Sequence, residues 1–325
     1  MLDIVILVAL PASGKSEVRK YLASLSPERC RDELALGETV QLDDFPYVHL
    51  MRRIDDELRE TGHPTVFFHS ADKPFKDPIE WGTLIELLNE DHARLVARAP
   101  FRTPSAGYLI LDRIDAARAA VGGGRPLGGI PAAVRAAVAA GIEAEARDLL
   151  NKLEEAQPPT LEGKTVVIEF ARGGPHGASM PLPAPYGYAY SLSRLSPRIL
   201  ERAAVLYVWV TPEESRRKNI ARGDPNDPGS ILHHSVPLDV MMNDYGCDDI
   251  DWLLSRSERP DTVRIEAHGR TFDLPLARFD NRVDKTSFVR NPRERWQDEE
   301  VGALHEGLSG ALRTLAGLRG AAAPR

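Results

Sequence analysis

Near its N-terminus the 325-residue chain reads Ile4-Val5-Ile6-Leu7-Val8-Ala9-Leu10-Pro11-Ala12-Ser13-Gly14-Lys15-Ser16. The continuous apolar run at its start predicts a strand that is buried on both faces, as in a parallel sheet. A helical pattern follows the small residues of the loop and extends from Lys15 to Leu25. A buried strand, a short loop and a helix in succession are typical of the opening unit of an α/β fold.

The loop itself follows the pattern GxxxxGK[ST], except that Ala9 stands at the first glycine. A methyl group is tolerated there if the local φ is negative. Backbone N–H groups of such a loop and the N-terminus of the following helix surround an anion. Lys15 places a cation on the β- and γ-phosphate oxygens, and Ser16 offers a hydroxyl to Mg²⁺. The predicted nucleotide-binding residues are Leu10, Pro11, Ala12, Ser13, Gly14, Lys15 and Ser16.

Further short apolar runs alternate with helical patterns along the chain. Candidate strands are 39–42, 165–170 and 203–210, and candidate helices are 48–60, 79–98, 107–120, 131–155 and 212–222. This alternation predicts an α/β fold with a parallel sheet flanked by helices. About 120 mainly helical residues separate the second and third core strands, which predicts a large helical insertion there. Within it, 65–68 is a candidate short strand.

These patterns suggest a division of the chain. We expect a nucleotide-binding core formed by 1–45 and 161–290, with a lid at about 211–230. The helical insertion at 46–160 is the expected acceptor-binding region, and 291–325 is a C-terminal helical tail. Within the core, 262–266 and 271–276 flank His268-Gly269 and predict a hairpin.

Composition excludes several classes of protein. Hydrophobic residues make up 42% and charged residues 27%, as in ordinary globular domains. The net charge of −7 argues against a nucleic-acid partner, which selects a basic surface. No apolar stretch reaches the ~18 residues that span a membrane, and an acid stands where a signal peptide is basic. The two cysteines, Cys30 and Cys247, form no metal motif, so we expect a reducing, cytoplasmic location.

The segment from Val40 to Tyr47, VQLDDFPY, resembles the "QDDF" segment of the uridine kinase and nicotinamide riboside kinase group. The resemblance implies that Asp43 faces the acceptor hydroxyl as a base or orienting group. It also implies ATP as donor and Mg²⁺ as its metal. The residues alone allow a second interpretation, in which Asp43 and Asp44 cap the helix that starts near Pro46, a role that suits Asp44 well.

A second strand, Val166 to Phe170, ends in an acid and is similar to the third-strand Glu-Gly of the same kinases, with Phe170 in place of the glycine. The resemblance implies that Glu169 holds Mg²⁺ or positions the acceptor. An ion pair with a nearby arginine is the alternative. Arg172, in the Gly- and Pro-rich loop that follows, is a candidate for binding an acceptor anion or for an ion pair with Glu169 or Asp43.

The helix predicted from Pro212 to Arg222 contains several basic residues. It resembles the kinase lid "RxxxR", which implies that basic residues of this helix close on the phosphates, either Arg216 with Arg222 or Arg217 with Asn219. A solvated basic face is the alternative interpretation. The segment Asn281-Arg282-Val283-Asp284 is a weak match to the guanine-reading NKxD, with Arg in place of Lys.

The preferred hypothesis is therefore a kinase that moves the γ-phosphoryl group of ATP to a hydroxyl of a small molecule. A regulatory NTPase and a non-catalytic nucleotide-binding protein are the alternatives, and the acceptor is not legible in the sequence.

Overall fold

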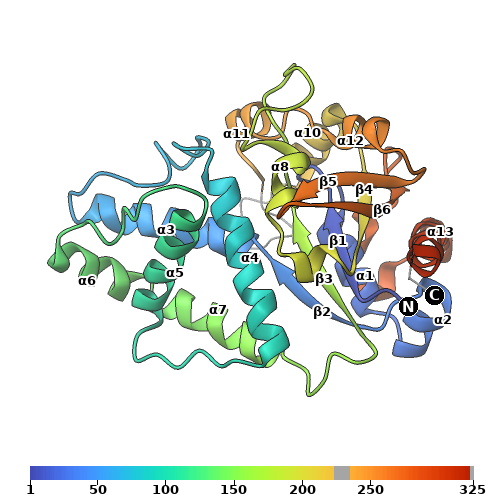
Figure 1. Cartoon of the computed structure of the whole chain (residues 1–325), viewed down its shortest axis with the longest axis horizontal. Helices are drawn as coiled ribbons and strands as arrows, with labels where there is room; N and C mark the ends of the chain where they lie inside the picture. The colour runs from blue at the N-terminus through green and yellow to red at the C-terminus, as the bar shows by residue number, and fades with distance from the viewer. Residues whose placement is uncertain (223–234, 323–325) are drawn as a thin grey trace.

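The computed structural model describes residues 1–222 and 235–322. In these residues the chain forms an α/β fold with an open, mostly parallel sheet flanked by helices (Figure 1). The strands are β1 (Ile4–Val8), β2 (Glu38–Asp43), β3 (Lys164–Phe170), β4 (Ala203–Trp209), β5 (Thr262–Ala267) and β6 (Arg270–Asp280). Their order is β2-β3-β1-β4-β6-β5, and only β5 pairs antiparallel among them. The predicted α/β class is confirmed.

The register of the parallel strands brings two acids together. Asp43 at the end of β2 is paired with Glu169 near the end of β3, and Glu169 is paired with Leu7 of β1. Because paired residues in parallel strands point to the same face, these side chains are neighbours. The carboxyl ends of β1, β2 and β3 thus meet at one edge of the sheet, where ligands bind in open α/β sheets.

The hairpin of β5 and β6 turns at His268 and Gly269, which both have positive φ (53° and 70°), as a tight turn requires. β6 then continues to Asp280 and pairs in parallel with β4, a connection that the sequence analysis did not predict. This extension places Asn281 beside the β1–α1 loop.

Helices cover both faces of the sheet. The alternation of β1 sends Ile4, Ile6 and Val8 to one face, which packs against α4 (Glu80–Ala97) and α8 (Gly187–Arg194). Val5 and Leu7 face α1 (Lys15–Ala23), α2 (Pro27–Leu34) and α13 (Asp298–Ala322). The C-terminal helix therefore belongs to the core, and its buried stripe has helical spacing: Leu304, Leu308, Leu312 and Leu315.

Between β2 and β3 the chain forms α3 (Phe45–Glu60), α4, α5 (Ala106–Ala120), α6 (Ala132–Gly141) and α7 (Glu143–Glu155). These helices share their own hydrophobic cluster beside the sheet (Figure 1). α4 contributes Leu84 and Leu87 to this cluster, and Ile85 and Leu88 to the core under the sheet. It therefore fixes the helical region to the sheet.

Two elements of the structure differ from those predicted from the sequence. The helix predicted over 131–155 is two helices that meet at Ile142. The candidate strand 65–68 forms no ladder, and Phe68 makes only an isolated bridge. The buried Asp55 carboxylate accepts the N–H groups of Val66, Phe67 and Phe68, and so takes the place of a neighbouring strand.

The remaining elements are α9 (Pro197–Leu200), α10 (Pro212–Arg222), α11 (Leu238–Asn243), α12 (Ile250–Arg256), and the short 3₁₀ turns η1 (Ser287–Arg290) and η2 (Arg293–Arg295). Across residues 1–222 and 235–322, no helix combines the length and the apolar character needed to cross a bilayer.

Candidate functional site

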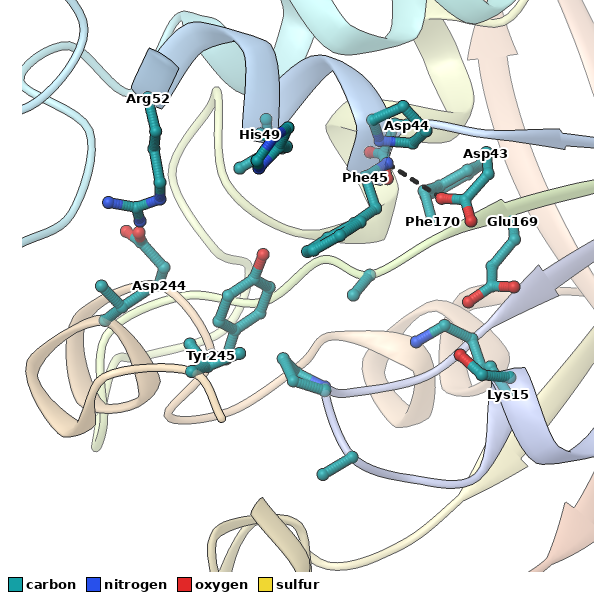
Figure 2. Close-up of a pocket in the computed structure, with 18 of the residues that line it drawn as sticks. Lys15, Asp43, Asp44, Phe45, His49, Arg52, Glu169, Phe170, Asp244 and Tyr245 are labelled. Atoms are coloured by element: carbon teal, nitrogen blue, oxygen red, sulfur yellow. Dashed lines mark hydrogen bonds between the residues drawn. The ribbon is translucent and has the colours of Figure 1, made fainter. Parts of the chain in front are cut away.

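A cavity of about 500 Å³ opens at the carboxyl edge of the sheet, a size that suits a small-molecule ligand. It lies between the β1–α1 loop, the start of α3 and the segment 236–245 (Figure 2). Lys15, Asp43 and Glu169 line one end. Aromatic side chains together with Arg52 and Asp244 line the other, so a single cavity has a strongly charged end and a mainly aromatic end.

The β1–α1 loop presents backbone donors to the charged end. The N–H of Val18 donates to the carbonyl of Gly14 (2.8 Å) at the start of α1. In the described part of the chain, no protein acceptor takes the N–H groups of Ala12, Ser13, Gly14 or Ser16. Unused N–H groups at a helix N-terminus attract an anion. The loop thus has the donor set that a phosphate needs.

Gly14 could not readily be another residue. Its φ is +105°, and a Cβ there would lie 2.4 Å from Thr286 Oγ1. Asn281 holds Thr286 close to the loop because its Nδ2 donates both to the Ser13 carbonyl (2.7 Å) and to Thr286 Oγ1 (2.9 Å). The loop after β6 therefore braces the β1–α1 loop from behind. By contrast, Ala9 is not among the residues with positive φ, so its methyl group is accommodated.

Lys15 is buried at the base of the cavity, and its ammonium group is directed into it (Figure 2). Its Nζ lies 3.4 Å from the Ala9 carbonyl and 3.5 Å from the Leu10 carbonyl, which are long distances for hydrogen bonds. Leu10 itself does not line the cavity, whereas Pro11 to Ser16 do. The ammonium group is placed where it could move to a phosphate without breaking a strong contact to these carbonyls.

Arg19 joins the two acids at the end of the strands. Its Nη1 donates to Asp43 Oδ2 (2.6 Å) and to Glu169 Oε2 (2.7 Å), and its Nε donates to the Gln41 side chain. Burial raises the pKa of Glu169, the charge of Asp43 raises it further, and Arg19 opposes both effects. The ion pair predicted as an alternative for Glu169 exists, and Arg19 supplies it. Sequence analysis missed Arg19, although its place four residues after Lys15 on α1 was a usable signal.

Of the two adjacent aspartates, Asp43 and not Asp44 contacts the start of the helix that the capping interpretation assigned to them. Asp43 Oδ1 accepts the N–H of Phe45 (2.9 Å) and so supports the start of α3. Asp44 occupies the N-cap position, but its side chain makes no capping hydrogen bond. The reason is Arg172, whose Nη1 donates to Asp44 Oδ2 (2.7 Å). Asp44 is buried, and burial raises its pKa while Arg172 opposes that shift.

Arg172 is only 1% exposed and does not line the cavity. Its guanidinium lies against the rings of Trp81 (4.9 Å) and Phe170 (5.1 Å) and also donates to Ser191 Oγ (3.1 Å). The predicted ion pair of Arg172 with Glu169 or Asp43 is thus formed with Asp44 instead. This arrangement fixes the β2–α3 junction from inside the protein.

The predicted lid is described only in part. Arg216 does not line the cavity, and its Nη2 donates to Glu213 (3.0 Å) one turn earlier. α10 touches the β1–α1 loop through Ser215, whose Oγ donates to the Pro11 carbonyl (2.7 Å). The side chain of Arg222 and residues 223–230 of the predicted lid lie outside the described residues.

The side chains that line the cavity also decide whether a metal ion could bind there. No cluster of three or more His, Cys, Asp or Glu side chains suited to a metal occurs in residues 1–222 and 235–322. Mg²⁺ at nucleotide sites does not require one, because it keeps waters and takes phosphate oxygens with one or two protein ligands. Ser16 and Glu169 both line the charged end, and Oε1 of Glu169 accepts no hydrogen bond from the described residues. These residues fit Mg²⁺ carried by a nucleotide.

Comparison with known proteins gave no relative: no protein-family model, no curated protein and no solved structure matches the chain. The case for a function therefore rests on the site itself.

The Arg19 bridge can be tested through stability. In Arg19→Ala, Asp43 and Glu169 face each other without their shared cation, so the pair should take up a proton at a higher pH. A folded-state pKa raised in this way gives stability that is present at low pH and lost as pH rises through that pKa. We expect the melting temperature to fall by about 5 °C at pH 8 and by less than half of that at pH 5. Thermal unfolding followed by circular dichroism between pH 5 and pH 8 measures this.

The control is Arg29→Ala, which breaks an exposed pair with Glu33 and should shift the melting temperature by about 1 °C or less at either pH. Equal losses at pH 5 and pH 8 in Arg19→Ala would assign Arg19 to packing alone.

Proposed function

We propose that this protein is a phosphotransferase that moves the γ-phosphoryl group of ATP to a hydroxyl of a small molecule. The observation that carries the proposal is the charged end of the cavity, where Lys15, Asp43 and Glu169 meet the backbone N–H groups of the β1–α1 loop. Phosphoryl transfer needs little covalent help from the protein, because catalysis comes from positioning and charge stabilisation. This end of the cavity supplies both.

In this proposal the β1–α1 loop is a phosphate-binding loop. N–H groups from Ala12 to Ser16 cradle the phosphates, and Lys15 neutralises charge on the β- and γ-oxygens. ATP with Mg²⁺ supplies the transferable group, and Ser16 and Glu169 would hold the metal. Arg216, with Arg222, is proposed to approach the phosphates from α10. The Nη1 of Arg216 is buried and has no hydrogen-bond partner in the described part of the chain. This supports a role for the side chain in binding a phosphate oxygen.

Asp43 is proposed to orient the acceptor hydroxyl. Its carboxylate lies 2.6 Å from Arg19 Nη1 and can accept a hydrogen bond from a hydroxyl in line with the phosphoryl group. We assign Arg172 to holding Asp44 and the β2–α3 junction, because it has no contact with the cavity.

The acceptor is proposed to occupy the aromatic end of the cavity, which is built largely by the helical region 46–160 inserted between the second and third core strands. α3 and the residues before and in α4 contribute Phe45, Phe68, Phe75 and Trp81 to its lining. This arrangement places an apolar body beside a charged transfer site. It supports a kinase over a regulatory NTPase, which needs no acceptor compartment.

A specific contact also weighs against the guanine-reading alternative. The carboxylate of Asp284 pairs with the buried Lys218 (3.0 Å) and accepts the N–H groups of Thr286 and Ser287 at the start of η1. A single oxygen of Asp284, Oδ1, makes all three of these contacts within the protein. Asn281 braces the phosphate loop, so the likeness to NKxD has a structural explanation.

The test is a thermal-shift screen of hydroxylated metabolites with Mg²⁺ and a non-hydrolysable ATP analogue. The proposal predicts that the analogue with Mg²⁺ raises the melting temperature and that a subset of hydroxylated compounds raises it further. A protein that is not stabilised by the analogue at millimolar concentration contradicts nucleotide binding.

A further inference from the structure

The aromatic end of the cavity contains a carboxyl group that has no ion-pair partner among the residues that the structure describes. Asp244 follows α11, lines the cavity and is 3% exposed. No side chain of the described residues forms a hydrogen bond or an ion pair with its carboxyl group. Burial raises the pKa of Asp244 to about 7, Arg52 opposes this shift and Asp239 adds to it. Leaving such a group buried costs stability, so the absence of a partner calls for an explanation.

The other charged side chains at this end are engaged. His49 contacts Glu145 (2.6 Å), and Lys152 pairs with Asp148 (2.6 Å). Arg52 is directed toward Asp244 (Figure 2), but it donates to the Ala71 carbonyl (2.6 Å) and lies 4.0 Å from the centre of the Phe68 ring. Its contacts therefore hold it short of an ion pair with Asp244.

An aromatic wall leads to this carboxyl group. The rings of Phe68 and Phe75 stack with centroids 4.5 Å apart, Phe75 meets the edge of Trp81 at 5.0 Å, and Trp81 meets Tyr245 at 5.5 Å. Tyr245 is the residue next to Asp244, and its ring projects into the cavity (Figure 2). Aromatic faces attract cations, and a carboxylate beside them completes a site for an ammonium group.

We propose that the aromatic end of the cavity binds a protonated amine through Asp244, Trp81 and Tyr245, and that the acceptor is an amino alcohol with an apolar or aromatic body. The inference rests on the proposed function in treating this cavity as the acceptor site. The amine forms an ion pair with Asp244, and the aromatic wall contacts the body of the molecule. The hydroxyl is then left to reach Asp43 at the opposite end.

A matched pair of probes tests this. Tyramine and tyrosol share the same phenol ring and chain length, but tyramine ends in an ammonium group and tyrosol in a hydroxyl. At pH 8, above the pKa of Asp244, isothermal titration without nucleotide should show tyramine binding to the wild type about 10-fold more tightly than tyrosol. At pH 6 the preference should shrink, because Asp244 is then mostly protonated.

Two variants locate the effect. Asp244→Asn should remove the preference, whereas Asp239→Asn should keep it, because Asp239 pairs with Lys73 (3.5 Å) and does not line the cavity. Folding should not obscure the result. Since the folded-state pKa of Asp244 is raised, its ionisation costs stability as pH rises through about 7. Asp244→Asn should therefore melt at a higher temperature than the wild type at pH 8, with a smaller difference at pH 5.

The inference is overturned if tyramine does not bind up to its solubility limit, if the two probes bind equally at pH 8, or if the preference survives in Asp244→Asn. Because the titration contains no nucleotide, a failure of phosphoryl transfer leaves it unaffected. Transfer to neutral alcohols without any amine preference would overturn this inference alone.

Discussion

Lys15→Ala should abolish ATP-dependent phosphoryl transfer while the protein stays folded. Lys15 is the cation at the base of the cavity, next to the N–H groups of the β1–α1 loop. Removal of a preorganised charge from the site of transfer costs on the order of 10²–10³ in rate. Because Lys15 is not part of the hydrophobic cluster that joins α1 to the sheet, we expect the protein to remain folded. Initial rates of ATP consumption with a metabolite extract, and thermal unfolding of the same preparation, measure the two effects.

The matched control is Lys20→Ala, which removes a lysine from the exposed side of the same helix and should keep nearly the full rate. A Lys15→Ala protein with a near-normal rate would exclude the phosphate-binding role of the loop.

Asp43→Asn should separate transfer from nucleotide binding. The carboxylate stands at the end of β2, beside Glu169 and Arg19, where it can orient an acceptor hydroxyl. Asparagine keeps an oxygen that can accept the N–H of Phe45 and so should preserve the start of α3. We therefore expect MgATP affinity close to that of the wild type and a loss of acceptor phosphorylation of about 10²-fold or more. Titration calorimetry and a transfer assay on one preparation measure both.

Comparison of the two losses identifies the role of Asp43. Equal losses of binding and transfer would make Asp43 a metal or folding residue. If neither changes, the carboxylate serves α3 and Arg19 alone, and the orienting role would pass to Glu169.

Local sequence patterns predicted the parts of the site that are local in the chain. The β1–α1 loop follows from thirteen consecutive residues, and its strand, turn and helix are where the pattern placed them. Asp43 and Glu169 were found because each stands at or near the end of a short predicted strand, and parallel strands bring such ends together.

The rest depends on contacts between distant segments. Nothing near Asp44 in sequence indicates that Arg172, 128 residues away, takes its carboxylate and leaves Asp43 to support α3. The brace from Asn281 to the loop requires β6 to run past its hairpin and pair with β4, which the short apolar pattern did not show. Asp244, which has no ion-pair partner within 1–222 and 235–322, faces Arg52 and the aromatic wall only because the segments that carry these residues line one cavity.

The most direct measurement is the fate of the γ-phosphoryl group. Wild-type protein, Mg²⁺ and ATP labelled at the γ-phosphate would be incubated with an extract of small hydroxylated metabolites, and the labelled products separated. We expect labelled organic phosphate whose formation requires the extract, Lys15 and Asp43. Release of labelled inorganic phosphate at the same rate with and without the extract, or no consumption of ATP, would contradict this expectation.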